Sequence, residues 1–277
     1  MSSPDWHVSD AQVIVDGVSK IYGISHGTSR DLGRFRKRPK SLSQALNEVS
    51  FFARSGEAIG VMGRNGSGKS TLLRLIAGSE KPTQGRILVR SKPVILGVTP
   101  ALIPHLNAWD NAQMGLLALG SSKSAARSVV GDVVEWTDLG DDANKPMRTY
   151  SSGQASRLSF AISTVIRPKI LIVDEALATG DMGFADKARS RMEEVLDAAG
   201  TIFLVSHSIT DVERICPRAI WLNDGELVAD GETRFVSGSY KRWQHLNSYG
   251  RIEEADELIS RARQMYPPTP FILSERS

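Results

Sequence analysis

One stretch of the sequence has the residue types and the spacing of a phosphate-binding loop. Residues 63–70 read Gly-Arg-Asn-Gly-Ser-Gly-Lys-Ser, and they lie between an apolar run and a segment with helical spacing. Glycines at such a turn let backbone N–H groups surround phosphate oxygens, and the helix N-terminus adds positive potential. Lys69 would contact the β- and γ-phosphates, and the Ser70 hydroxyl would bind Mg²⁺. We therefore expect a nucleoside triphosphate to bind through Gly63, Arg64, Asn65, Gly66, Ser67, Gly68, Lys69, Ser70 and Thr71.

Two carboxylates follow a second apolar run. Residues 170–173 read Ile-Leu-Ile-Val and predict a buried strand, and Asp174 and Glu175 come directly after it. The carboxyl ends of parallel strands meet at the edge of the sheet where ligands bind. Asp174 would then hold Mg²⁺, and Glu175 could act as the general base for the water that attacks the γ-phosphate. The alternative for such an Asp-Glu pair is a solvated strand end.

Two further groups fit the same site less specifically. His207 follows the apolar run 202–205, where it could bind the γ-phosphate and orient the attacking water. A lone histidine is more often structural. Residues 150–154, Tyr-Ser-Ser-Gly-Gln, precede a predicted helix, and small hydroxyls at a helix N-terminus form an anion site. Ser152 would serve equally well as the N-cap of that helix.

Apolar runs and turn residues predict the elements that position these groups. Strands are expected at 13–18, 45–53, 58–62, 86–90, 93–96, 170–173, 202–205 and 219–229, the last of these folded into a hairpin at 223–225. Helices are expected at 71–77, 109–119, 122–137, 152–166, 182–199, 210–216, 235–247 and 252–265. Buried strands that alternate with helices indicate an α/β fold with a mainly parallel sheet.

The composition excludes several other classes. Hydrophobic residues make up 41% of the 277 residues and charged residues 23%, which is typical of a globular protein. The single cysteine, Cys216, excludes a disulfide scaffold and a multi-cysteine metal site, and we expect it to be a buried packing residue. No run of 18 apolar residues and no secretory signal is visible, so we expect no membrane-spanning helix.

The net charge of +3 is unevenly distributed. Residues 30–40 carry six basic side chains and one acidic side chain, a net charge of +5, which leaves −2 for the rest of the chain. The segment is either a solvated loop or a contact for anionic lipid headgroups, to which each basic side chain contributes about 1 kcal/mol. Phe35 is the only aromatic residue within it, which is unfavourable for stacking on nucleic-acid bases.

Together these motifs resemble the ATP-binding cassette (ABC) ATPases over residues 13–231. Residues 150–154 correspond to the Leu-Ser-Gly-Gly-Gln signature, with Tyr and Ser at its first and third positions. Asp174 and Glu175 match the Walker B pair, 178–181 the D-loop, and His207 the switch histidine. Tyr22 lies where the family stacks an aromatic ring on adenine. The resemblance implies ATP and Mg²⁺ as cofactors and ATP hydrolysis, with Lys69, Glu175 and His207 as catalytic residues.

The resemblance also implies a P-loop NTPase fold, with a RecA-like core, an antiparallel β subdomain and an α-helical signature subdomain. We expect the core at 1–97 and 154–231 with a basic insert at 24–43, the helical subdomain at 98–153, and a C-terminal helical extension at 232–277. Family members associate head to tail. A second copy would therefore receive Ser151, Ser152, Gly153, Gln154 and Asp181 in trans. Val98 stands where most cassettes have the Q-loop glutamine.

A narrower similarity, at residues 149–153 and 174–178 and in the insert, is to the ATPases of teichoic-acid, O-antigen and related polysaccharide exporters. It implies a lipid-linked polymer as substrate, a polytopic membrane permease as partner, and a peripheral location at the cytoplasmic face of the cell membrane, with 30–40 toward the membrane. Alternatives are an exporter of a drug or another lipid, a regulator that does not turn over ATP, and a soluble ABC ATPase acting on DNA or ribosomes. In this family, members that act in DNA repair carry long coiled-coil insertions, and members that act on ribosomes usually carry two cassettes. Neither feature is present in the sequence, so we expect no nucleic-acid partner.

Overall fold

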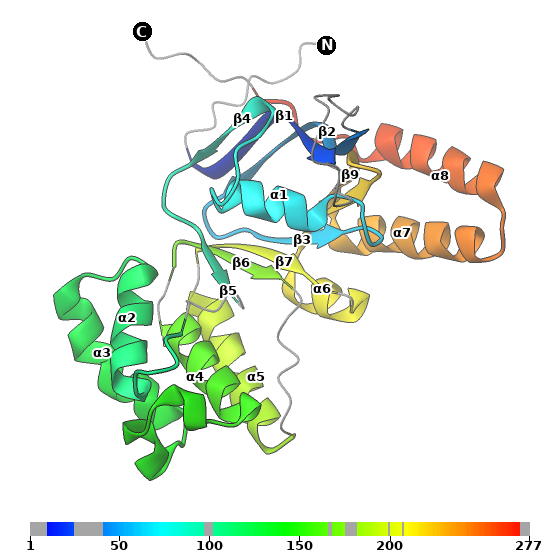
Figure 1. Cartoon of the computed structure of the whole chain (residues 1–277). Coiled ribbons are helices and arrows are strands. Elements are labelled where there is room, and N and C mark those ends of the chain that lie inside the picture. Colours follow the sequence, from blue (N-terminus) through cyan, green and yellow to red (C-terminus); the bar gives the residue numbers. More distant parts are fainter. Residues whose placement is uncertain are drawn as a thin grey trace, which may run out of the picture. The chain divides into compact units, whose positions relative to one another are not determined.

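The computed structural model (Figure 1) describes residues 10–24, 41–96, 102–165, 168–174, 182–198, 200–206 and 208–271. The chain forms two compact units, one made of residues 1–90 and 208–277 and the other of residues 91–207. The first contains the phosphate loop and the C-terminal helices. The second contains the segment of the signature motif. The basic segment 30–40 lies outside the described residues.

The first unit contains the predicted antiparallel sheet, in the order β2-β1-β4. Its strands are β1 (Ala11–Ile24), β2 (Ser41–Arg54) and β4 (Gln84–Val89). Val13 and Val15 are fully buried, and Ile14 between them is also buried, in a small apolar cluster with Ala11 and Phe52, so both faces of this part of the sheet are covered. A Cβ atom on Gly85 would lie 2.3 Å from the carbonyl oxygen of Gly17, so the two strands approach each other as closely as glycine allows.

The same unit contains β3 (Ala58–Met62), which pairs in parallel with β8 (Arg218–Asn223). β8 continues through a two-residue turn into the antiparallel β9 (Glu226–Glu232). Asp224 and Gly225 both have positive φ, 48° and 81°, which is the conformation that a tight hairpin between twisted strands requires. The hairpin predicted at 223–225 is therefore confirmed.

Arg218 joins β8 to its neighbours by an ionic cluster around the buried Asp230. Its guanidinium group donates two hydrogen bonds of 2.7 Å to the carboxylate of Asp230 on β9. It also donates to the Phe52 carbonyl oxygen on β2 at 3.0 Å and to Glu57 at 2.9 Å. The Asp230 side chain is only 2% exposed. Charges at this depth are tolerated because four of the five guanidinium N–H groups donate hydrogen bonds within the cluster.

The C-terminal extension consists of helices α7 (Thr233–Ser248) and α8 (Ile252–Met265), which lie side by side in Figure 1. Tyr240 and Trp243 of α7 pack edge-on against the fully buried Trp221 of β8, with ring centroids 5.6 Å apart in both pairs. Ser237 donates to Glu213 of the short helix α6 (Ile209–Ile215) at 2.6 Å. Cys216 follows α6 and is buried, as predicted.

The second unit contains the parallel strands β5 (Val94–Leu96), β6 (Ile170–Asp174) and β7 (Thr201–Val205). Helix α5 (Met182–Ala198) connects β6 to β7. Such a helical crossover is what a parallel strand pair requires. Residues 170–173 and 201–205 are buried along their whole length, which explains why both strands appear in the sequence as continuous apolar runs.

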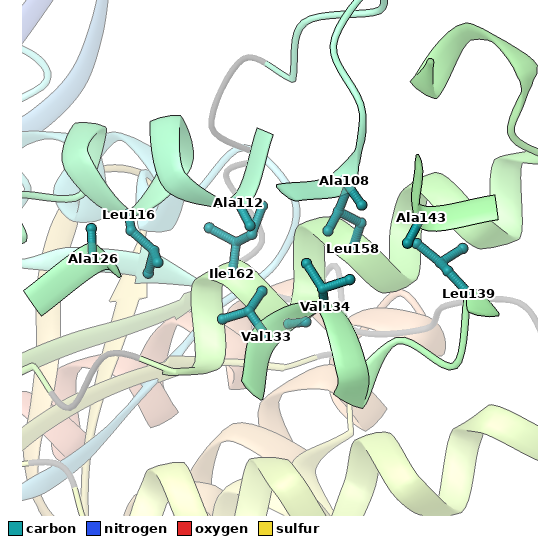
Figure 2. Close-up of a cluster of buried hydrophobic side chains, with 11 residues drawn as sticks. Ala108, Ala112, Leu116, Ala126, Val133, Val134, Leu139, Ala143, Leu158 and Ile162 are labelled. Carbon is teal, nitrogen blue, oxygen red and sulfur yellow. The ribbon is translucent and has the colours of Figure 1, made fainter. Parts of the chain in front are cut away.

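The helical part of this unit comprises α2 (Ala108–Ala118), α3 (Lys123–Trp136) and α4 (Ser152–Val165), together with 3₁₀ turns at Gly140–Asn144 and Met147–Thr149. Figure 2 shows side chains of the three helices pointing toward one another. The buried cluster is Ala108, Ala112, Leu116, Ala126, Val133, Val134, Leu139, Ala143, Leu158, Ala161 and Ile162. Because α4 packs into this core, the predicted domain boundary at residue 153 falls inside a helix of the helical subdomain.

The ends of these helices follow from their capping residues. The Ser122 hydroxyl accepts a hydrogen bond from the Ala125 N–H at 3.2 Å, so Ser122 is the N-cap of α3, at the residue where the sequence predicted this helix to begin. Asn107 caps α2 in the same way, through the N–H of Asp110 at 2.9 Å. In the described ranges, no helix combines the length and the apolar character needed to cross a membrane.

Candidate nucleotide-binding site

The phosphate loop lies between β3 and helix α1 (Lys69–Ile76). Gly63 and Gly68 have φ angles of 149° and 103°. A Cβ atom on Gly63 would lie 2.3 Å from the Leu222 carbonyl oxygen, and one on Gly68 would lie 2.6 Å from that of Ala45. Both glycines are therefore required by their backbone conformation and by the strands against which the loop packs.

The Lys69 ammonium group lies over the loop. Its Nζ donates to the carbonyl oxygens of Gly63 at 2.6 Å and Arg64 at 2.9 Å, so it bridges the start of the loop to the helix. No side chain caps the N-terminus of α1, and no acidic residue lies in its first turn. Backbone N–H groups and a lysine at one helix end form a site for an anion with several oxygens, such as a polyphosphate.

The turn of the β8–β9 hairpin supports the loop from outside. The Gly225 N–H donates to the Ser67 carbonyl oxygen at 3.1 Å, and the Gly225 carbonyl accepts from the Asn47 N–H at 2.8 Å. Arg64 forms an ion pair with Asp224 at 2.6 Å. Sequence reasoning identified this segment only as a hairpin, because no local pattern shows that its turn meets residues some 160 positions earlier.

The residues predicted to bind Mg²⁺ come from both units. Ser70 lies in the first turn of α1 with its side chain exposed, and a hydroxyl oxygen is a ligand type that Mg²⁺ accepts alongside phosphate oxygens and water. Asp174 is the last residue of β6 and is paired with Val205 of β7. Glu175, Asp181, His207 and Val98 lie outside the described residues, so their predicted roles, and the absence of the Q-loop glutamine, stay at the level of the sequence.

Tyr22, predicted to stack on adenine, lies on β1 opposite Ser43 of β2. Its hydroxyl group donates a 2.6 Å hydrogen bond to Glu80, and the Lys20 ammonium group lies 5.0 Å from the centroid of its ring. Arg74 of α1 also binds Glu80, at 2.7 Å. Sequence reasoning missed Lys20, Arg74 and Glu80, because three ordinary surface charges in separate segments carry no local signal.

The signature residues form the start of α4. Ser151 and Gln154 make a reciprocal capping box: the Gln154 N–H donates to the Ser151 hydroxyl at 3.2 Å, and the Ser151 N–H donates to the Gln154 side chain at 2.9 Å. The suggestion that Ser152 is the N-cap is thus wrong by one residue, since the reciprocal pair needs a spacing of three. Ser151, Ser152 and Gly153 are exposed.

Tyr150 and Asp142 explain how the altered signature is accommodated. The Tyr150 ring packs at the edge of the helical core, and its hydroxyl group donates to the Asp142 carbonyl oxygen at 2.9 Å. The Asp142 carboxylate accepts from the Gln154 side chain at 2.8 Å. Hydrogen bonds from Lys145 and then Gln154 lower the pKa of Asp142, so it remains an acceptor for Gln154 at neutral pH.

Comparison with known proteins agrees with the resemblance to ABC ATPases found in the sequence. Residues 46–178 match the ABC transporter family. The chain is 36% identical to the teichoic acids export ATP-binding protein TagH of Listeria innocua, over 80% of this chain and 68% of that protein. The Staphylococcus haemolyticus TagH is 32% identical, over 90% and 94%. The Bacillus cereus TagH is 36% identical over 86% of this chain, which spans only 43% of that relative's length.

Solved structures resemble the fold. One is a dimeric post-hydrolysis state of the ATP-binding cassette MJ0796 bound to ADP and Pi, with a TM-score of 0.61, 24% identity, and coverage of 80% of this chain and 98% of that one. Another is the ATP-binding subunit of an ABC transporter, with a TM-score of 0.62, 20% identity, and coverage of 90% and 99%. The fold and the loop define an α/β P-loop nucleotide-binding cassette. The chain belongs to the ABC transporter family of ATP-binding proteins.

Proposed function

We propose that this chain binds ATP with Mg²⁺ and hydrolyses it to drive export of a lipid-linked cell-surface polysaccharide through a separate membrane permease. The observation that carries the proposal is the phosphate loop, with Lys69 over it and Gly63 and Gly68 held in conformations that suit only glycine. The TagH relatives, whose names give teichoic acid export, match over 80–90% of this chain and supply the substrate class.

Each residue of the site has a distinct part in the proposed reaction. The loop N–H groups and Lys69 bind the phosphates and neutralise charge that develops on them. Ser70 and Asp174 would hold Mg²⁺, which neutralises phosphate charge when bound. Glu175 would accept a proton from the attacking water, and His207 would orient that water toward the γ-phosphate. Tyr22 would stack on the adenine.

We propose that the active form is a head-to-tail dimer. The start of α4 supports this, because Ser151, Ser152 and Gly153 are exposed at a helix N-terminus that suits an anion. These residues, with Gln154 and Asp181, would contact ATP bound to the second copy. Replacement of Glu175 by Gln tests both the proposed hydrolysis and the proposed dimer. Hydrolysis should fall by about 100-fold or more, since a general base contributes at least that much.

The Glu175→Gln variant should also still bind ATP and form an ATP-dependent dimer, measured by light scattering after gel filtration. The matched control is Asp132→Asn, on the exposed side of α3, which should behave like the parent. Near-normal turnover of Glu175→Gln would exclude Glu175 as the base.

Extraction in mild detergent followed by mass spectrometry should find a polytopic membrane protein bound to the chain. A ribosome or DNA complex instead would overturn the export function.

The basic segment 30–40 is proposed to contact the membrane surface beside the permease, at the cytoplasmic face of the cell membrane. Its net charge of +5 supports this, since four neutralised side chains would remove up to about 4 kcal/mol of attraction to anionic headgroups. Replacement of Arg34, Arg36, Lys37 and Arg38 by Gln should reduce sedimentation with anionic vesicles and leave ATP affinity unchanged. Equal sedimentation of parent and variant would make the segment a solvated loop.

A further inference from the structure

The hydroxyl end of Tyr22 belongs to a polar cluster that the proposed function does not use. Glu80, which follows α1, accepts from the Tyr22 hydroxyl at 2.6 Å. The other oxygen of its carboxylate accepts from Arg74 Nε at 2.7 Å, and Lys20 Nζ lies 3.1 Å from the first. The carboxylate therefore receives donors from β1 and from α1, and its side chain is only 25% exposed.

Arg74 extends this cluster to the phosphate loop. It lies on α1, one turn after Thr71, and its terminal NH2 group is 3.4 Å from both the Tyr22 hydroxyl and the Thr71 hydroxyl. Thr71 immediately follows Lys69 and Ser70 in the first turn of the helix. The polar cluster therefore joins the aromatic ring on β1 to the helix end at which phosphates are proposed to bind.

Lys20 covers one face of the Tyr22 ring. Its ammonium group lies over one face of Tyr22, 5.0 Å from the ring centroid, and donates to the Lys81 carbonyl oxygen at 2.8 Å. A cation over the ring is itself an attractive contact. A planar base would stack on the opposite face. Thr83, just beyond Glu80, accepts from the Ile21 N–H at 3.0 Å and holds this segment along β1.

The charge state of Glu80 keeps the cluster assembled at neutral pH. The hydrogen bond from Tyr22, and further ones from Lys20 and Arg74, lower the pKa of Glu80 to about 2. The carboxylate thus remains ionised, and an acceptor, throughout the pH range found in cells. Isolated surface ion pairs contribute little to stability. The Glu80 carboxylate is different, because three donors share it and hold it in one place.

We propose that Glu80 is a positioning residue for the nucleobase: it fixes the Tyr22 ring relative to the phosphate loop, so that one ATP molecule satisfies the stacking and phosphate contacts at once. This inference rests on the proposed function, because it needs ATP as the ligand. A free ring would have to be ordered on binding, which lowers affinity for a nucleotide. Affinity for a ligand without a base would not change.

The test compares ATP with inorganic triphosphate, by calorimetry, in the parent and in Tyr22→Phe, Glu80→Ala and the double variant. Tyr22→Phe keeps the ring and loses the tether. Each single variant should weaken ATP binding about three- to tenfold, the range expected for the net contribution of one intramolecular hydrogen bond, and leave triphosphate binding unchanged. The double variant should be no weaker than either single one, because both remove the same interaction.

Two further variants keep the test decisive. Glu80→Gln retains an oxygen that accepts from Tyr22, and it should recover most of the ATP affinity. Asp16→Asn is the matched control, because it breaks an exposed ion pair with Arg86 in the same sheet, away from Tyr22, and it should bind both ligands like the parent. Additive losses, or equal losses for ATP and triphosphate, would overturn the inference alone. A parent that binds neither ligand would overturn the proposed function as well.

Discussion

The phosphate loop and the signature turn both place small residues before a helix, but the chain holds them in different ways. A Cβ atom on Gly68 would meet the carbonyl oxygen of Ala45 at 2.6 Å, whereas one on Gly153 would meet only the Ser151 hydroxyl, at 3.9 Å. The first glycine is required by the strands packed around it. At the second, no described neighbour requires glycine, and the proposed contact with the nucleotide of a second copy would be its reason.

The phosphate-loop region should be the more sensitive to loss of a neighbour, and the largest effect is expected at the Arg218 cluster. Replacement of Asp230 by Asn leaves a guanidinium group under-neutralised between β8 and β9, the strands whose turn supports the loop. The free energy of unfolding should fall by about 3–5 kcal/mol. Urea unfolding followed by tryptophan fluorescence measures this, since Trp221 is buried on β8.

The control for this change is an ion pair at the surface of the same unit. Asp16→Asn breaks the Arg86–Asp16 pair, in which both side chains are more than one third exposed. Its effect should be no more than about 1 kcal/mol. Equal losses for the two variants would show that burial of the Arg218 cluster does not determine its contribution.

A smaller but more local loss is expected for Gly68→Ala. A left-handed conformation costs an alanine about 1–2 kcal/mol, and displacement of the Ala45 carbonyl adds to that, for a total of about 2–4 kcal/mol. ATP binding should be lost at the same time, because the loop N–H groups move. Gly66→Ala separates the two causes, since Gly66 has φ 81° but a Cβ atom there would meet nothing within 4 Å. It should lose only the conformational part.

Local sequence signals predicted the elements well, because each depends on neighbouring residues. Apolar runs predicted the buried strands β6 and β7. A serine directly before a segment with helical spacing predicted where α3 begins, and two residues that tolerate positive φ predicted the Asp224-Gly225 turn. The cap at Ser151 was misplaced by one residue, because adjacent serines provide equivalent hydroxyl groups. Only the partner Gln154 distinguishes them.

Contacts between distant segments could not be predicted in this way. The Tyr22–Glu80 hydrogen bond joins residues 58 positions apart, and the Arg64–Asp224 ion pair joins residues 160 apart. Neither segment carries a pattern that names the other. The same applies to α7: a helix was expected at 235–247, but the sequence did not show that Tyr240 and Trp243 pack on Trp221. The sequence thus predicted the motifs of the site, whereas the contacts that hold these motifs in place were seen only in the structure.

At the signature turn, a modest effect is expected from the cap. Ser151→Ala removes the acceptor for the Gln154 N–H and should lower the free energy of unfolding by about 1 kcal/mol. Ser152→Ala is the matched control, because Ser152 is exposed in the first turn and does not accept that bond. Its effect should lie within about 0.5 kcal/mol. A larger loss for Ser152→Ala than for Ser151→Ala would place the cap where the sequence suggested.

The smallest effect on stability, and the sharpest contrast with Gly68, is expected for Gly153→Ala. Gly153 is exposed in the first turn of α4 without a positive φ, so alanine should change the free energy of unfolding by less than about 0.5 kcal/mol. In the Glu175→Gln background each chain should still bind ATP, but the ATP-dependent dimer should weaken, because the added methyl group lies on the surface proposed to meet the partner's nucleotide. Light scattering with and without ATP measures this. If Gly153→Ala leaves the dimer intact, or destabilises the chain as much as Gly68→Ala does, the two glycines do not differ in the way the structure indicates.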